Sequence, residues 1–160
     1  MAGHPWLLIP RTVRFGDTDA AGVMHFHQLL RWCHEAWEES LQRFGIPAAE
    51  IFPGCGAGAE PPAVAVPLVH CSADFRRPLH CGDGLQIVIS PRSTGSGGFE
   101  VAFELRRHAG PPATETVATA LLRHRAIAAI SRRPCPLPPA LEQWLQASVD
   151  DESPGYLAGN

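Results

Sequence analysis

The sequence predicts an α+β fold in which an antiparallel sheet of about five strands wraps around one long central helix. Two observations carry this prediction. Residues 27–44 form one strongly amphipathic helical segment, and the segments that follow it are strand-like and separated by short turns. Successive hairpins give an antiparallel sheet, and a single amphipathic helix can cover only one of its faces. The uncovered face and edges favour association with a partner subunit.

Local patterning defines each element. Residues 11–15 form the first expected strand, with Val13 and Phe15 on one face. The helix 27–44 ends at Gly45 and Pro47. Its apolar stripe has spacings of three and four and consists of Leu29, Leu30, Cys33, Trp37, Leu41 and Phe44, whereas Gln28 and the charged residues fall mostly off it. A loop at 51–62 precedes strands expected within 63–76, 85–90, 99–107 and 114–130, and a short helix is expected at 139–148.

Composition limits the class of protein. The 160 residues suit a single domain, assigned to 1–148, with a frayed tail at 149–160. The net charge of −3 argues against nucleic-acid binding, and the absence of lysine excludes Schiff-base chemistry and a lysine-containing phosphate loop. Five cysteines without a CxxC pair favour free thiols. With no membrane-length apolar run and no basic signal-peptide start, we expect a cytoplasmic protein.

Two carboxylates in a glycine-bounded loop are the clearest candidates for catalytic groups in the sequence. Asp17 and Asp19 lie two residues apart, between Gly16 and Gly22, just before the long helix. The helix dipole and the free amides at a helix N-terminus favour an ionised carboxylate there, and such a group can attack an acyl carbon or activate water. The competing interpretation is an Asp turn with charge compensation at the helix start.

Other polar groups have structural explanations beside functional ones. His25 and His27 have a spacing that permits two metal ligands, but no third ligand is evident, and a role in lining a pocket or a turn is favoured. His34, near the apolar stripe, is interpreted as an interface histidine. The glycines at 95–98 are expected in a hairpin turn. The arginine pairs at 76–77, 106–107 and 132–133 either solvate strand ends or bind phosphates.

The segment Phe15-Gly16-Asp17-Thr18-Asp19-x-x-Gly22-Val23 resembles the signature of the 4-hydroxybenzoyl-CoA thioesterase branch of the hotdog-fold superfamily. The stretch from Pro67 to Asp83 is similar to the next segment of that branch. The helix segment Cys33-His34-Glu35-Ala36-Trp37-Glu38-Glu39-Ser40-Leu41 resembles the 1,4-dihydroxy-2-naphthoyl-CoA hydrolases of phylloquinone synthesis. The resemblance covers roughly residues 8–130.

The resemblance implies roles for particular residues. Asp19 matches the catalytic carboxylate of the family, which acts as a nucleophile or a general base, whereas Asp17 is structural. Phe26 stands where many relatives have His or Tyr, and so implies an aromatic acyl pocket, with His25 beside it in the substrate site. Ala65 matches a segment whose amide polarises the thioester carbonyl. The phosphate-binding arginines of one relative fall at Gly95 and Ser96 here and are not transferred.

We therefore expect a homo-oligomeric thioesterase that hydrolyses an aromatic acyl-CoA, with 1,4-dihydroxy-2-naphthoyl-CoA as the leading substrate. The expected assembly is a dimer or a dimer of dimers with active sites at subunit interfaces. Coenzyme A belongs to the substrate, and neither a cofactor nor a metal is expected. The alternatives are another aryl- or fatty-acyl-CoA substrate, a non-catalytic acyl-binding protein, or a structural oligomerisation domain.

Overall fold

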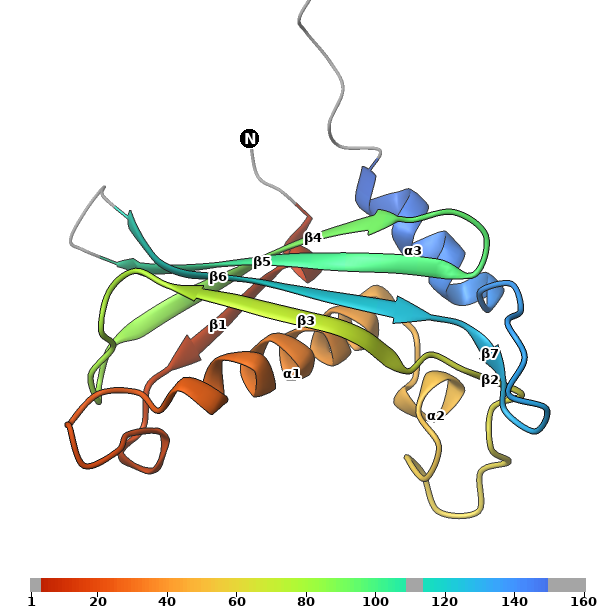
Figure 1. The fold of residues 1–160 in the computed structure, drawn as a ribbon, viewed down its shortest axis with the longest axis horizontal. Coiled ribbons are helices and arrows are strands. Elements are labelled where there is room, and N and C mark those ends of the chain that lie inside the picture. The colour runs from red at the N-terminus through yellow and green to blue at the C-terminus, as the bar shows by residue number, and fades with distance from the viewer. Residues whose placement is uncertain (1–3, 109–113, 150–160) are drawn as a thin grey trace, which may run out of the picture.

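The computed structural model describes residues 4–108 and 114–149, and its main element is a curved antiparallel sheet packed on one long helix (Figure 1). The sheet has five strands in the order β1-β4-β5-β6-β3. Their bounds are β1 Leu8–Thr12, β3 Leu68–Phe75, β4 Gly84–Ser93, β5 Gly98–His108 and β6 Thr114–Arg125. Two short strands, β2 Val64–Ala65 and β7 Ile127–Ala128, pair separately. The predicted fold class is confirmed.

The long helix runs across the concave side of the sheet, and the C-terminal helix lies beside β4 (Figure 1). The long helix α1 spans Phe26–Phe44, one residue more than predicted, and ends at Gly45, whose left-handed φ of 110° suits glycine. Helix α2 spans Ala48–Ile51, and α3 spans Pro139–Val149. The predicted C-terminal helix is thus confirmed, whereas the predicted tail lies, from residue 150 onward, outside the described residues. No described helix is long and apolar enough to cross a membrane.

The core forms where α1 meets the inward positions of the strands. In β4, Leu85, Ile87 and Ile89 alternate inward and are buried, as period-two patterning requires. The buried face of α1 is broader than the predicted stripe. It also includes Gln28, Trp32, Ala36 and Ser40, whereas Leu30 and Phe44 are only half-buried. Ser40 is buried because its hydroxyl accepts a hydrogen bond from Trp144 Nε1 of α3 at 3.1 Å.

The prediction of a first strand at 11–15 is wrong in its bounds. The strand lies at 8–12, and Phe15 is 84% exposed in a short 3-10 turn at Phe15–Asp17. The chain turns there because the amide of Arg14 donates to Asp17 Oδ2 at 2.8 Å, and the Thr18 amide and hydroxyl both donate to the Phe15 carbonyl. These hydrogen bonds of the turn, and not the apolar alternation of Val13 and Phe15, therefore decide where the strand ends.

Two long predicted strands are interrupted. The segment 63–76 splits into β2 and β3, and the segment 114–130 splits into β6 and β7. At the first break Pro67 lacks an amide, and at the second the amide of Ala126 donates to Gly97 instead of continuing the ladder. The paired breaks set the β2–β7 ribbon apart from the main sheet at the end of the molecule that holds α2 (Figure 1).

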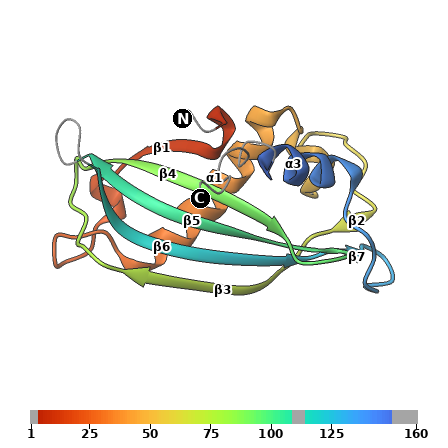
Figure 2. The same ribbon diagram turned by 90° about the horizontal axis from the view of Figure 1, so that it is seen from above.

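The two edges of the sheet differ. Strand β1 is a short edge that contains Pro10, whereas β3 is an eight-residue edge whose side chains are mostly exposed. Val69 and Phe75 are 57% and 53% exposed, which is unusual for large apolar side chains in a strand. Figure 2 shows β3 along one open side of the sheet, with β1 along the other.

Candidate functional site

The loop that carries Asp19 is a compact turn tied to the start of α1. Thr18 and Met24 form an isolated antiparallel bridge, and Asp19 and Val23 lie next to it. The Asp19 amide donates to the Val23 carbonyl at 3.0 Å, and the Gly22 amide donates to the Asp19 carbonyl at 3.0 Å. Asp19 Oδ1 accepts from the Ala21 amide at 2.8 Å, yet the side chain is exposed. The geometry therefore holds an accessible carboxylate in one orientation.

The carboxylate of Asp17 is bound to the backbone of the turn that precedes the loop. Its Oδ2 accepts from the Arg14 amide, and its own carbonyl accepts from the His25 amide at 2.9 Å. Asp17 thus joins the turn that precedes the loop to the residue that begins the helix. This arrangement suits a structural carboxylate and distinguishes it from Asp19.

The first turn of α1 lies beside this loop. His25 is the N-cap residue, and its ring accepts from the His27 amide at 3.3 Å, while the Nδ1 atoms of the two rings also contact each other. Phe26, between them, is 69% exposed. Across residues 4–108 and 114–149, no group of three or more His, Cys, Asp or Glu side chains could hold a metal ion.

A cavity of about 310 Å³ adjoins the Asp19 loop. Its walls are Val23 and Met24 of the loop, Phe75 at the end of β3, residues 76–79 after it, and Ala118 of β6. The Met24 amide donates to the Leu79 carbonyl at 2.7 Å, which fastens the loop to this wall. We call the Asp19 loop, the first turn of α1 and this cavity the carboxylate end of the molecule.

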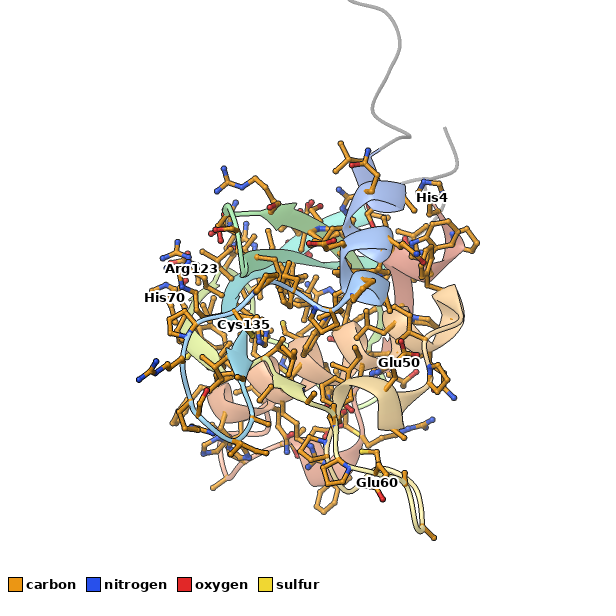
Figure 3. All side chains as sticks on the ribbon, turned by 90° about the vertical axis from the view of Figure 1, so that its right-hand side faces the viewer. His4, Glu50, Glu60, His70, Arg123 and Cys135 are labelled. Carbon is orange, nitrogen blue, oxygen red and sulfur yellow. The ribbon has the colours of Figure 1, made fainter. Side chains whose placement is uncertain are left out.

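A second cavity, of about 250 Å³, lies at the opposite end of β3. It is formed by His34 and Trp37 of α1, residues 51–53, residues 65–68 and Arg132. We call this region the ring end, because five of the ten residues that line the cavity carry an aromatic or proline ring. Figure 3 looks onto this end of the molecule, with Glu50 marking α2 and His70 marking β3.

The predicted site residues therefore divide between the two ends within one chain. Asp19, His25 and Phe26 lie together at the carboxylate end, and Ala65 lies at the ring end. Ala65 is opposite Ile127 in the β2–β7 ladder. Two positions away, the Ala129 amide donates a hydrogen bond to the Ala63 carbonyl. Bonded pairs alternate along an antiparallel ladder, which directs the Ala65 amide toward Ile127.

Two histidines at the ring end belong to one aromatic cluster. His124 is 1% exposed, stacks on Phe99 at 4.9 Å between ring centroids, and its Nδ1 lies 3.0 Å from the Val66 carbonyl. Burial lowers the pKa of His124 from 6.5 to about 4, so the ring is neutral near pH 7. His34 packs edge-on against Trp37, and its Nδ1 lies 2.6 Å from Glu38 Oε1.

The arginine pairs differ in their partners. Arg106 and Arg107 are bound to carboxylates, and Arg77 pairs with Glu115 at 3.0 Å. Arg132 stands apart, because it lines the ring-end cavity and has a left-handed φ of 61°, the only positive φ of a non-glycine residue in the described chain. All five cysteines are free, as predicted. Burial raises the pKa of the Cys33 thiol to about 12, which makes that thiol unreactive.

Sequence reasoning named only Ala65, by resemblance, among the site residues that line the ring-end cavity. It placed Trp37 in the core stripe and left Arg132 between solvating a strand end and binding phosphate, and nothing in their spacing connects them to residues 51–53. His34 was identified as a possible interface residue, and the glutamate four positions later was the one local signal that its ring is held in place.

The chain is similar to known thioesterases over most of its length. The model of the thioesterase-like superfamily matches residues 13–145. A 1,4-dihydroxy-2-naphthoyl-CoA hydrolase of Prochlorococcus marinus strain MIT 9303 is 54% identical over 143 residues, which are 89% of this chain and 91% of that protein. One from Synechococcus sp. strain CC9311 is also 54% identical, over 144 residues that cover 90% and 91%.

Solved structures agree with the sequence comparison. The crystal structure of a 1,4-dihydroxy-2-naphthoyl-CoA thioesterase from Synechocystis superposes with a TM-score of 0.77 at 31% identity, covering 92% of this chain and 98% of that one. These findings confirm the family resemblance that the Asp17–Asp19 loop indicates.

Proposed function

The chain belongs to the thioesterase-like superfamily, and we propose that it hydrolyses 1,4-dihydroxy-2-naphthoyl-CoA to the free aromatic acid and coenzyme A. The observation that carries the proposal is the exposed, oriented carboxylate of Asp19 at the start of α1, in a chain whose relatives bear the name of this activity. The reaction belongs to naphthoquinone synthesis. In this proposal it needs no metal and no cofactor beyond the coenzyme A of the substrate.

Asp19 supplies the reacting carboxylate by one of two routes. In the first, a carboxylate oxygen attacks the thioester carbonyl carbon, the C–S bond breaks, the thiolate of coenzyme A leaves, and water then hydrolyses the mixed anhydride. In the second, Asp19 removes a proton from a water molecule that attacks the same carbon. Both routes end with the free acid and the thiol, and in both the carbonyl oxygen gains negative charge on the way.

The N-terminus of α1 can stabilise that charge. In its first turn, the amides of His27 and Gln28 have acceptors, the His25 ring and the His25 carbonyl. The Phe26 amide remains as a donor beside the Asp19 loop. A helix N-terminus adds a positive partial charge there, so Phe26 N–H is the donor that we assign to the developing oxyanion. Phe26 lies at the carboxylate end and Ala65 lies at the ring end of the same chain. The Ala65 amide, to which the family resemblance assigns the thioester carbonyl, is therefore not beside Asp19 of its own subunit.

The exposed β3 edge supports a homodimer with shared sites. Strand β3 offers eight residues free of proline and an apolar edge, whereas the other edge contains Pro10. Pairing two β3 edges antiparallel about a two-fold axis sets the Leu68 end of one strand against the Phe75 end of its partner. The carboxylate end of each subunit then faces the ring end of the other, so that each active site draws on both chains. Two such dimers can form a tetramer, and the five free thiols support a reducing compartment such as the cytoplasm.

Release of free thiol from a panel of acyl-CoAs tests the function. We expect turnover of the dihydroxynaphthoyl thioester with a clear preference over medium-chain acyl-CoAs. A preference for another acyl group would change the substrate, and binding without turnover would indicate an acyl-binding protein. Light scattering tests the assembly, and an active monomer of about 17 kDa would contradict the shared site.

A further inference from the structure

We propose that Arg107 is a positioning residue for the reaction, because it fixes the segment 76–83 to the end of the sheet and this segment in turn fixes the place of the Asp19 loop. The inference rests on the proposed function and deepens it, since it names a side chain outside the site that sets where the reacting carboxylate lies. In this proposal Arg107 acts through the backbone of the segment it binds and not on the substrate.

Arg107 lies near the end of β5, on the concave face of the sheet. It pairs with Leu85 of β4 and with Glu115 of β6, and Leu85 is buried in the core. Because directly paired residues of antiparallel strands share a face, the guanidinium lies on the same side as the core. Its side chain is 24% exposed, so the charge is largely covered by the groups that it binds.

The guanidinium of Arg107 binds two carboxylates and one backbone carbonyl. Its Nη1 donates to the Pro78 carbonyl at 3.1 Å and to Asp83 Oδ2 at 3.1 Å, and its Nη2 donates to Glu115 Oε2 at 2.6 Å. A planar group with five donors can serve three acceptors from three directions, which a lysine ammonium on a flexible stem does less well.

Two further hydrogen bonds extend this cluster along the segment 76–83. Glu115 Oε1 accepts from Arg77 Nε at 3.0 Å, and Asp83 Oδ2 accepts from the His80 amide at 3.0 Å. The hydrogen bond from the guanidinium holds the pKa of Glu115 below its ordinary value, so this carboxylate is charged at neutral pH. The segment is therefore attached to β5 and β6 both near its start and at its end.

The same segment holds the C-terminal side of the Asp19 loop. The Met24 amide donates to the carbonyl of Leu79, which directly follows Pro78, at 2.7 Å. Val23, next to Met24, accepts from the Asp19 amide at 3.0 Å. Figure 1 shows this connection between β3 and β4 at the end of the sheet that lies over the loop before α1. A short path of covalent and hydrogen bonds thus joins the guanidinium to the backbone of Asp19.

The N-terminal side of the loop is attached to the segment as well. The Val13 amide donates to the Asp83 carbonyl at 2.9 Å, and the Gly82 amide donates to the Val13 carbonyl at 2.8 Å. Asp83 is also the residue whose carboxylate accepts from Arg107. The guanidinium therefore bridges the two attachment points of the loop, one before it at Val13 and one after it at Met24.

This arrangement separates the shape of the loop from its position. Short-range bonds, such as that from the Ala21 amide to Asp19 Oδ1, keep the carboxylate in one orientation within the loop. The place of the loop relative to the sheet depends on the two attachment points. A displacement of about 1 Å at a reacting group can cost roughly a hundredfold in rate. Loss of the guanidinium should therefore slow the chemical step more than it weakens substrate binding.

Steady-state thiol release from the dihydroxynaphthoyl thioester by Arg107→Met provides the kinetic test. Methionine keeps an unbranched side chain but donates no hydrogen bond. We expect kcat to fall roughly tenfold to a hundredfold with KM changed by less than about twofold, because the lost contact orients the reacting group and does not bind the substrate. Arg107→Lys restores the charge without the planar donors and should recover part of kcat.

Arg106→Met is the matched control. Arg106 is the neighbouring residue of β5, pairs with Gln86 on the opposite face, and its ion pair with Glu104, at 2.7 Å, does not include Pro78 or Asp83. We expect its kcat to stay within about twofold of the wild-type value, because a partly exposed ion pair contributes little.

Amide hydrogen exchange separates a displaced loop from general destabilisation. Arg107→Met should speed the exchange of the Met24 amide, which bonds to Leu79, by a larger factor than that of the core amide of Ile87. Equal acceleration of the two amides would mean that Arg107 stabilises the whole domain, and would overturn the inference.

The outcomes distinguish this inference from the proposed function. If the wild-type protein hydrolyses the thioester and Arg107→Met loses no more kcat than Arg106→Met, or raises KM alone, the assignment of Arg107 is wrong and the function stands. If the wild-type protein hydrolyses no thioester, the proposed function fails. The exchange comparison of Met24 with Ile87 then still tests whether Arg107 positions the loop.

Discussion

The carboxylate end and the ring end of this molecule are built in different ways. At the carboxylate end, residues 14–28 make most of their hydrogen bonds with one another, as Asp17 does with Arg14 and Asp19 does with Ala21. At the ring end, the cavity combines four segments that are distant in sequence, and His124 bonds to Val66 across 58 positions. The difference teaches that the loop of Asp19, the proposed reacting group, is assembled from neighbouring residues, whereas the ring-end cavity exists only in the folded chain.

The largest expected effect distinguishes Asp17 from Asp19, the two carboxylates at the carboxylate end. Asp19→Asn removes the nucleophile or base while keeping its shape, and we expect kcat to fall at least roughly a hundredfold with the fold intact. Asp17→Asn can still accept from the Arg14 amide and should cost little activity, with its effect mainly on stability. Steady-state thiol release and thermal unfolding of both variants provide the measurement, and the reverse ranking of activities would exchange the two roles.

The ring end should respond to acid through His124. Its folded pKa of about 4 lies below the ordinary value of 6.5, so the unfolded chain takes up a proton first as the pH falls. The folded state is then destabilised progressively between pH 6.5 and pH 4. We expect His124 to account for a loss of about 2 kcal/mol in the free energy of unfolding between pH 7 and pH 5.

Chemical denaturation at the two pH values measures this loss. His124→Phe cannot titrate and serves as the reference, because all other titrating groups remain present in both proteins. An equal pH dependence in the variant and the wild type would show that His124 is not responsible.

Phe26 sharpens the comparison, because it offers an aromatic face at the carboxylate end. Phe26→Ala should lower kcat/KM for the naphthoyl substrate by roughly tenfold to two hundredfold, which corresponds to roughly 1–3 kcal/mol for a truncated apolar contact. The loss should be smaller for a medium-chain acyl-CoA, so the gap between the two substrates narrows. An unchanged ratio of aromatic to aliphatic substrates would mean that Phe26 does not read the substrate.

The smallest effect concerns the contact that joins α3 to the long helix. Ser40→Ala leaves Trp144 Nε1 without its buried acceptor, and we expect a loss of about 1 kcal/mol in the free energy of unfolding. A double-mutant cycle with Trp144→Phe isolates this bond. The cost of Ser40→Ala should shrink when Trp144 is already Phe, and an equal cost in both backgrounds would assign it to packing alone.

The sequence by itself determined the elements whose cause is local. The stripe at 27–44, the alternation of Leu85, Ile87 and Ile89, and the glycine after α1 each express their structure within a few residues, so those elements follow from pattern alone. The Asp17–Asp19 loop belongs to the same class, because short-range hydrogen bonds shape it, and its residues could be proposed as a site from the sequence alone.

Tertiary structure decided what depends on contacts between distant segments. The burial of Ser40 required α3, the break after residue 125 required Gly97, and the cavity at His34 required residues 51–53, 65–68 and 132 to meet. The periodicity of apolar residues does not predict such contacts, because each segment is compatible with many partners. The sheet order β1-β4-β5-β6-β3 brings the right segments together. For that reason Asp19 could be proposed as a site residue from the sequence, whereas the ring-end cavity could be found only from the fold.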